Sequence, residues 1–326
     1  MNARAVGLQI ALAAVGLMAA FLVWQREPEG LPGDVSVLDI SRRALQRVRY
    51  DDATRFVELY RDAQDEETLW VRLGGKPPEA TGEGKPVDAS PPRELRGNEL
   101  ARSLFFSFAP LKGMRALGVL DAKKLTQLGI TDSPRRLTLT VEGREQVLTL
   151  ASPVEAQWGS PYVLREDGRV FLLGPTLLPD LEGAATRLVD RRMHTLEPGD
   201  FDAFTVFQGT NERAFVVRGK PPEPVTVASR SAPDVPTELV RSWHERVWQL
   251  LPLEVFGRGE PPPSGETEEL FRVEYKRGDK VVGHITVTRG FQGDFYARTE
   301  HTAGWVRLHG SVEPLAVEAI QVASGR

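Results

Sequence analysis

Ala5–Trp24, with the sequence AVGLQIALAAVGLMAAFLVW, is the stretch on which the predicted organisation of this chain depends. It contains no charged side chain, and Gln9 is its only strongly polar residue. A helix of this length spans about 30 Å, the hydrocarbon thickness of a bilayer, and it satisfies its own backbone hydrogen bonds in lipid. Trp24 and the following Arg26 are residue types that favour the membrane–water interface. The sequence therefore predicts that residues 1–24 form a short tail and a transmembrane anchor.

Two other interpretations of this run remain open. A secretory signal has an apolar region of about 7–15 residues and a small residue three positions before its cleavage site. The run here is longer, and cleavage after Ala19 or Ala20 would place Leu17 or Met18 at that position. The second alternative is a buried core helix, but the segment that follows, residues 25–34, has the proline and glycine content of a linker. A retained anchor is favoured.

The predicted orientation leaves the N-terminus inside and the body of the protein outside the cytoplasmic membrane. Arg4 and the α-amino group give the short tail the positive charge that favours the cytoplasmic side. Arg26, on the other side, is accompanied by Glu27 and Glu29. The roughly 300 residues that follow form a segment too long for this charge rule to apply to it.

Composition limits the classes of function. The 41 basic and 45 acidic residues give a formal net charge of −4, so no basic excess indicates nucleic-acid binding. The chain has no cysteine, which excludes a disulfide framework, a thiolate nucleophile and lipoprotein processing. The part after the anchor is long enough for two ordinary domains.

Residues 35–196 are predicted to form a first repeat of strands and helices. Alternation of apolar and polar residues predicts half-buried strands at residues 46–50, 55–60, 69–73, 136–141, 146–150, 162–165 and 170–173. Glu142-Gly143-Arg144 and Asp167-Gly168 have the composition of tight hairpin turns. Residues 76–93 are rich in proline and glycine, which predicts a long exposed loop or a disordered insert.

Helices are predicted at three places in this first repeat. Glu99–Leu111 places Leu100, Leu104, Phe105 and Phe108 on one face, the pattern of a helix that packs against a sheet. Leu120–Ile130 is expected to be helical or rich in turns, and Thr176–Val189 is expected to be a further helix.

Residues 197–326 are predicted to form a second repeat with the same order of elements. Its expected strands are residues 201–207, 213–217, 225–228, 269–275, 281–288, 295–298 and 305–308, with a turn at Arg277-Gly278-Asp279. Thr237–Phe256 is the strongest helix signal, and its predicted apolar face consists of Leu239, Val240, Trp243, Val247, Leu250 and Leu251. Val312–Val322 is expected to be a last helix.

Short sequences recur at matching places in these two segments. Gly75-Lys76-Pro77-Pro78-Glu79 is repeated from Gly219 to Glu223, and Glu99-Leu100-Ala101-Arg102-Ser103 corresponds to residues 238–242. Coincidence is the alternative, since proline-rich loops resemble one another easily, but the matches keep their order along the chain. We therefore predict an α+β fold: an N-terminal transmembrane helix followed by two tandem β-rich α+β repeats, each an antiparallel sheet packed by a helix.

Over most of its length after the predicted anchor, the chain resembles the family of bacterial proteins that contain domain of unknown function 4340. The resemblance rests on Leu128-Gly129 followed by Pro134 before a strand, together with Tyr162-Val163, Val170-Phe171 and the run Leu188-Val189-Asp190-Arg191-Arg192. The second segment has Pro261-Pro262-Pro263 in place of the leucine–glycine element. The resemblance implies a single-pass protein of the bacterial cytoplasmic (inner) membrane with a periplasmic body, often encoded with gliding-motility-type ABC transporter subunits. It implies no catalytic or binding residue.

No motif in the sequence indicates a common catalytic site. The Gly-Lys pairs at residues 75–76, 84–85 and 219–220 are each followed by proline rather than the serine or threonine of a phosphate loop. His244-Glu245 begins like a zinc-protease helix, but Trp248 occupies the position of the second histidine, so a solvated or interface histidine is expected. His284, His301 and His309 could converge on zinc, and a pair of carboxylates without fixed spacing could act on glycosides. We expect no catalytic, cofactor-binding or metal site.

Tryptophans are the remaining candidates for ligand binding. Trp70, Trp158, Trp243, Trp248 and Trp305 could stack on sugar rings, although residues of this type more often belong to a core or an interface. Taken with the anchor and the resemblance, these features predict a non-enzymatic accessory subunit of an envelope ABC transport system. Its expected partners are the lipid bilayer, a permease and auxiliary membrane subunits, without nucleic acid or cofactor. The alternative is an envelope polysaccharide- or peptidoglycan-binding protein. A tethered hydrolase is a third and less favoured hypothesis.

Overall fold

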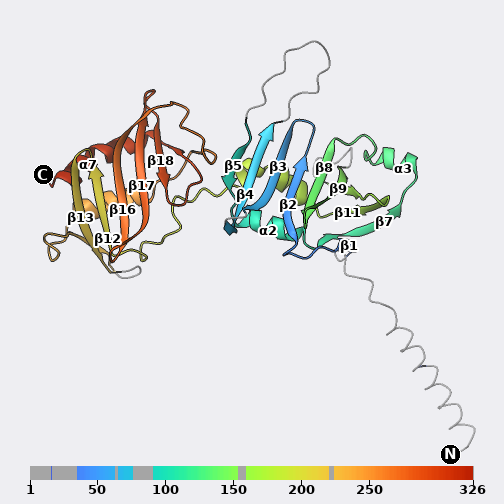
Figure 1. Cartoon of the computed structure of the whole chain (residues 1–326), viewed down its shortest axis with the longest axis horizontal. Coiled ribbons are helices and arrows are strands. Elements are labelled where there is room, and N and C mark those ends of the chain that lie inside the picture. The colour runs from blue at the N-terminus through green and yellow to red at the C-terminus, as the bar shows by residue number, and fades with distance from the viewer. Residues whose placement is uncertain are drawn as a thin grey trace, which may run out of the picture. The chain divides into compact units, whose positions relative to one another are not determined.

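The computed structural model describes residue 16 and residues 35–62, 65–75, 91–152, 159–219 and 224–325. The described part is mostly β-sheet with a few helices, which confirms the predicted α+β class (Figure 1). By contact, the chain divides into two compact units, each built from two segments: Met1–Gln46 with Leu104–Pro179, and Arg47–Ser103 with Asp180–Arg326. The predicted repeat boundary between residues 196 and 197 remains a prediction.

The predicted anchor lies outside the described residues except for Gly16. Among the residues that the structure describes, no helix is long and apolar enough to cross a membrane. Most of the proline-rich insert, residues 76–90, and residues 220–223 of its second copy also lie outside the described ranges.

The first unit contains an antiparallel set of strands in the order β8-β9-β10-β11-β7. Its elements are β1 (Val35–Leu38), β6 (Leu111–Gly113), β7 (Arg115–Val119), α3 (Ala122–Gln127), β8 (Arg135–Val141), β9 (Arg144–Ala151), β10 (Tyr162–Leu164) and β11 (Arg169–Leu172). The predicted turn between β8 and β9 is confirmed: Val141 pairs with Arg144, and Glu142 and Gly143 both have positive φ, at 50° and 77°. Positive φ at both central residues is the geometry of a tight hairpin that matches strand twist.

The second unit begins with four antiparallel strands in the order β5-β4-β3-β2. They are β2 (Leu45–Asp51), β3 (Arg55–Asp62), β4 (Asp65–Gly75) and β5 (Arg93–Arg96), and α2 (Glu99–Ser107) follows. Arg49, Glu58, Arg72 and Glu94 form one cross-strand row. Glu58 is only 1% exposed, and Arg72 donates to it at 3.0 Å. This buried ion pair was not predicted, because alternation alone does not reveal which charges face one another across strands.

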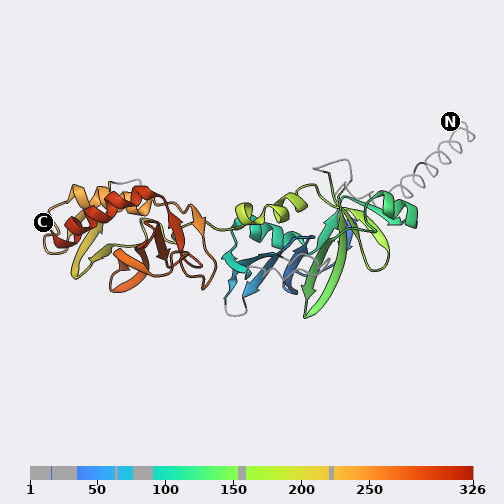
Figure 2. The same ribbon diagram turned by 90° about the horizontal axis from the view of Figure 1, so that it is seen from above.

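The second unit also contains an eight-stranded antiparallel sheet in the order β14-β13-β12-β16-β17-β18-β19-β15. Its elements are α5 (Ala184–Arg187, preceding the sheet), β12 (Ala203–Gln208), β13 (Asn211–Arg218), β14 (Thr226–Ser229), α6 (Glu238–Trp248), β15 (Glu254–Val255), β16 (Thr267–Arg277), β17 (Lys280–Gly290), β18 (Phe295–Thr299), β19 (Val306–Leu308), η1 (Gly310–Val312) and α7 (Glu313–Ser324). Figure 2 shows α6 and α7 together on one face of this sheet. The indole N–H of Trp243 donates to the Leu315 carbonyl at 2.9 Å and joins the two helices inside the core.

The order of strands recurs along the chain. The order β5-β4-β3 corresponds to β14-β13-β12, and β8-β9-β10-β11-β7 corresponds to β16-β17-β18-β19-β15. A helix follows β5 at Glu99 and another follows β14 at Glu238, the two positions that the sequence matches indicated. This recurrence is the structural observation that bears most directly on a duplication.

Three predicted helices have the wrong extent. Glu99–Leu111 ends as α2 at Ser107, and Thr237–Phe256 ends as α6 at Trp248. Proline disfavours helical backbone at the residue before it and has no N–H to donate, and Pro110 and Pro252 follow these two ends. Leu251, predicted on the apolar face, is 77% exposed. The expected helix Thr176–Val189 is instead divided by Gly183 into α4 (Leu177–Glu182) and α5.

Asn98 fixes the beginning of α2 and offers a test of this region. Its side-chain oxygen accepts the Ala101 N–H at 2.9 Å, and its amide donates to the Arg187 carbonyl at 2.7 Å. We expect Asn98→Ala to lower the free energy of unfolding by about 2 kcal/mol, measured by urea denaturation. Asn98→Asp keeps the cap but loses the amide donor, so its loss should be smaller. Equal stability of Asn98→Ala and the wild type would contradict the role of this cap.

Candidate functional site

A buried aspartate–histidine pair lies where the chain enters the eight-stranded part of the second unit. Oδ2 of Asp190 lies 3.0 Å from Nε2 of His301, and both side chains are buried. Arg192 donates to Asp190 from its backbone N–H at 2.9 Å and from its guanidinium. Burial alone would raise the pKa of Asp190, but the hydrogen bonds from His301 and Arg192 outweigh it and hold that pKa well below its usual range. Asp190 is therefore a fixed negative charge.

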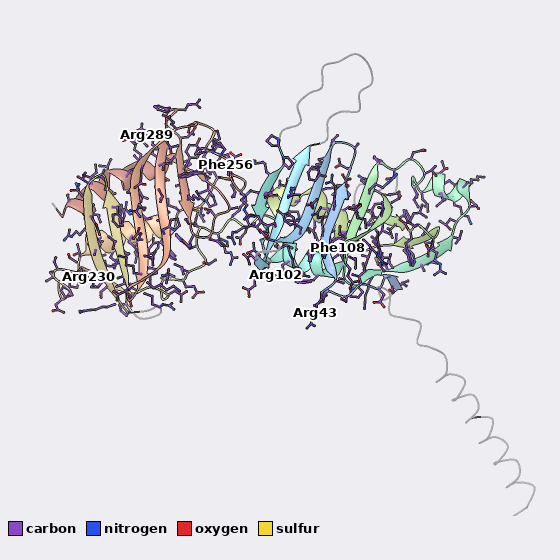
Figure 3. The ribbon with its side chains drawn as sticks, viewed as in Figure 1. Arg43, Arg102, Phe108, Arg230, Phe256 and Arg289 are labelled. Carbon is purple, nitrogen blue, oxygen red and sulfur yellow. The ribbon has the colours of Figure 1, made fainter. Side chains whose placement is uncertain are left out.

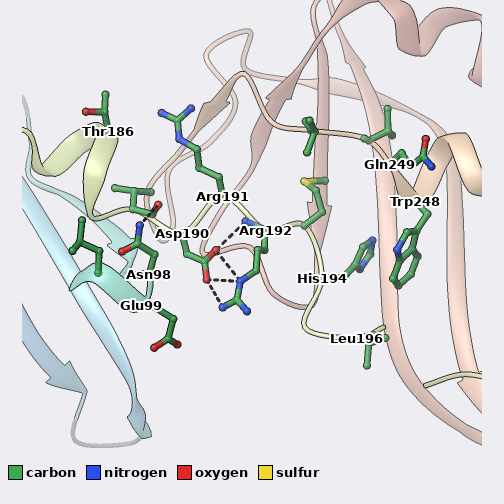
Figure 4. A pocket seen from close by; sticks show the side chains of 15 residues that line it. Asn98, Glu99, Thr186, Asp190, Arg191, Arg192, His194, Leu196, Trp248 and Gln249 are labelled. Atoms are coloured by element: carbon green, nitrogen blue, oxygen red, sulfur yellow. Dashed lines mark hydrogen bonds and ion pairs between the residues drawn. The ribbon is translucent and has the colours of Figure 1, made fainter. Parts of the chain in front are cut away.

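A second acid–imidazole pair lies nearby along the chain. Oε1 of Glu300 is 3.0 Å from Nδ1 of His194, and the backbone N–H of His284 donates to Oε2 at 3.0 Å. Burial acts to raise the pKa of Glu300, and these hydrogen bonds lower it below its ordinary value. The His194 ring stacks on Trp248 with centroids 4.4 Å apart and planes 7° apart. Figure 4 shows the two rings facing each other.

His244 is a buried member of the aromatic core. It is 8% exposed and stacks on Phe204 at 4.5 Å, with Tyr275 edge-on at 5.7 Å. Burial, with a smaller contribution from the charge of His194, lowers its pKa to about 4. The expectation that His244 is a solvated or interface residue was therefore wrong. Its position four residues after Val240 and three before Val247 places it on the buried face of α6.

The histidines do not assemble a metal site in the part of the chain that the structure describes. His301 is paired with Asp190, and Nδ1 of His309 accepts the Ser311 N–H at 3.1 Å as the cap of η1. His284 contributes its backbone N–H to Glu300. Within residues 35–62, 65–75, 91–152, 159–219 and 224–325, no group of three His, Asp or Glu residues could hold a metal ion.

An open pocket of about 790 Å³ adjoins the two acid–imidazole pairs (Figure 4). It is lined by Asn98, Glu99, Leu100, Thr186, Val189, Asp190, Arg191, Arg192, Met193, His194, Leu196, Trp248, Gln249, Leu250 and Leu251. The Asp190 carboxylate and Nδ1 of His194 already have protein partners. Glu99 supplies a second carboxylate, which is exposed and pairs with Arg102 at 4.0 Å.

A second cleft of about 570 Å³ contains two of the candidate tryptophans. It is lined by Trp70, Arg96, Arg258, His284, Thr286, Arg298, Thr299, Glu300, Thr302, Ala303 and Trp305. The Trp70 ring has the guanidinium of Arg258 at 4.8 Å and that of Arg96 at 5.6 Å from its centroid. The cleft combines polar side chains with indole surface, of which the half-buried Trp305 offers more than Trp70.

The other candidate tryptophans are placed differently. Trp243 is fully buried between α6 and α7, and Trp248 stacks on His194. Trp158 lies outside the described residues. Of the five candidates, the structure thus brings Trp70 and Trp305 to one cleft.

Comparison with known proteins adds no relative. No protein-family model matches the chain, and a search of curated proteins finds no match.

Proposed function

We propose that this protein is a membrane-anchored, non-enzymatic accessory subunit of a bacterial envelope ABC transport system, with its body in the periplasm. The observation that carries the non-enzymatic part is the mutual pairing of the buried titratable groups: Asp190 with His301, and Glu300 with His194. A catalytic acid or base needs an accessible hydrogen-bonding position directed at a substrate. In each pair one ring nitrogen faces the carboxylate, and the other, Nε2 of His194 or Nδ1 of His301, has no partner among the described residues but is buried away from solvent. The membrane part rests on the uncharged run Ala5–Trp24 and on the family resemblance.

We also propose that the body arose by duplication, as two tandem α+β repeats at residues 35–196 and 197–326. The recurring strand orders and the matching helix starts at Glu99 and Glu238 support this. A duplicated non-catalytic body suits a subunit that contacts partners at more than one surface.

Copurification tests the transporter proposal. The full-length chain, tagged at its C-terminus, is crosslinked in its native membranes, solubilised in mild detergent and purified. We expect a polytopic permease, and the ATPase bound to it, to be recovered in stoichiometric amounts. A form in which residues 1–24 are replaced by a cleavable signal peptide is the matched control and should lose both. Recovery of the full-length chain without any permease would overturn the proposal.

A second candidate function is binding of an envelope polysaccharide. The observation that favours it is the cleft that contains Trp70 and Trp305, because flat aromatic faces beside hydrogen-bonding side chains are suited to sugar rings. Thr286 supplies a hydroxyl group at the same cleft, whereas the hydroxyl of Thr302 is hydrogen-bonded to the backbone of Thr299. The two functions are compatible, since a transport accessory subunit can hold a glycan outside the membrane.

A further inference from the structure

The cleft that contains Trp70 and Trp305 carries an excess of positive charge. Three arginines, Arg96, Arg258 and Arg298, line it, against the single carboxylate of Glu300. That carboxylate is already engaged by His194 and by the backbone N–H of His284. The lining therefore offers guanidinium donors to a ligand, while its one carboxylate is already used by the protein.

The three arginines differ in how far they are already used. Arg258 forms an ion pair with Asp62 at 2.9 Å. Arg96 donates to the Thr68 hydroxyl at 3.3 Å, while its buried Nε has no acceptor among the described residues. Arg298 is exposed, and no ion pair joins it to another described residue. Arg298 is thus the cation most available to a ligand.

The two tryptophans give the cleft an aromatic surface that is held in place. Trp70 is 5% exposed, and the guanidiniums of Arg96 and Arg258 hold its ring in place through cation–π contacts. Trp305 is half-buried and therefore keeps part of its indole surface accessible. Guanidinium groups recognise carboxylates through two parallel hydrogen bonds, and the aromatic surface suits the apolar face of a sugar ring.

Resting on the second candidate function, we propose that this cleft binds an acidic polysaccharide. The sugar ring lies against Trp305, and Arg298, assisted by Arg96, pairs with a carboxylate of the polymer. The volume of about 570 Å³ is within the usual range for a pocket of this kind. A nucleic acid is disfavoured because successive bases need several accessible aromatic faces, and in this lining Trp70 is almost fully covered, which leaves the single face of Trp305.

Calorimetric titration of the full-length chain in detergent tests this proposal. The probe is a galacturonate oligosaccharide, and its fully methyl-esterified form is the matched ligand, with the same rings and no charge. We expect the acidic form to bind at least about tenfold more tightly than the ester, and added salt to weaken its binding. An oligothymidylate of equal charge should bind more weakly than the galacturonate.

Variants locate the site. Trp305→Ala and Arg298→Gln should each weaken galacturonate binding by about tenfold, because each removes a direct contact with the ligand, and tryptophan and arginine contacts contribute most at binding sites. Arg230→Gln and Phe291→Ala are matched controls at exposed positions outside the cleft lining, and they should leave affinity unchanged. Figure 3 labels Arg230 well away from Phe256, and Phe256 lies two residues before Arg258, which lines the cleft. Arg298→Gln changes an exposed side chain, so its result stands even if Trp305→Ala folds poorly.

Each result distinguishes the proposals. Equal binding of the ester and the acid would overturn the acidic ligand and leave saccharide binding in place. Equal affinities of Arg298→Gln and Arg230→Gln would overturn the assigned site, and preferential binding of the oligothymidylate would overturn the ligand class. If neither saccharide binds, this proposal and the second candidate function both fail, whereas the transporter proposal depends on copurification alone.

Discussion

Asp190→Asn is expected to lower the free energy of unfolding by about 3 kcal/mol, because it removes a buried carboxylate charge that hydrogen bonds from His301 and Arg192 stabilise. The carboxylate lies 3.0 Å from Nε2 of His301 and accepts the backbone N–H of Arg192 at 2.9 Å. Asparagine has nearly the same shape, so the loss reflects charge and hydrogen bonding rather than a cavity. Urea denaturation of the full-length chain in detergent at pH 7 measures it.

The control is an aspartate whose charge is exposed. Asp234 pairs with Arg218 at 3.2 Å, but its side chain is 87% exposed. Asp234→Asn should therefore change stability by about 0.5 kcal/mol or less. In addition, Asp190→Asn combined with His301→Asn should cost less than the sum of the single changes, since both disrupt one interaction. Equal effects at Asp190 and Asp234, or strict additivity, would show that the buried pair does not act as a unit.

The strands of this protein were predictable because their side chains alternate. In residues 269–275, for example, Phe271, Val273 and Tyr275 recur at every second position, and all three are buried in β16. The short strands β1, β5, β6, β7 and β15 were missed. Each contains only two to five residues, which leaves little room for a period, whereas the equally short β10 and β11 were predictable with the help of the Asp167-Gly168 turn signal between them. Helix ends were misplaced where a following proline was given too little weight.

The candidate site was less predictable than the fold. Asp190 and His301 are separated by 111 residues, and His194 and Glu300 by 106, so no local pattern joins them. Asp190 was noted only as part of a resemblance, and Arg298 only as one residue of a strand. Residue type alone made Trp70 and Trp305 candidates for ligand binding, and this stays a prediction. That they share a cleft depends on tertiary structure, which spacing along the chain does not encode.

The buried imidazole of His244 is expected to make the protein lose stability in mild acid. Its pKa is about 4 in the folded protein, against 6.5 for an unperturbed histidine, because of burial and the nearby His194. Above pH 6.5 the imidazole is neutral in both states, so its contribution to stability is complete. Between pH 6.5 and 4 the unfolded chain takes up a proton that the folded chain excludes. Stability therefore falls by about 1.4 kcal/mol per pH unit in this window, or about 2 kcal/mol by pH 5.

His244→Leu removes the imidazole that titrates, so the free energy of unfolding should depend less on pH. The measurement is the free energy of unfolding at pH 7 and at pH 5, and the wild type should lose about 2 kcal/mol more than the variant. Comparing the two pH values within each protein separates this effect from any change in packing against Phe204, which is present at both. His309→Asn is the control, because His309 is exposed and asparagine can still cap η1. The contacts of α6 indicate that the core encloses the His244 imidazole. If His244→Leu loses as much stability between pH 7 and pH 5 as the wild type does, His244 accepts its proton in the folded protein, and this enclosure is contradicted.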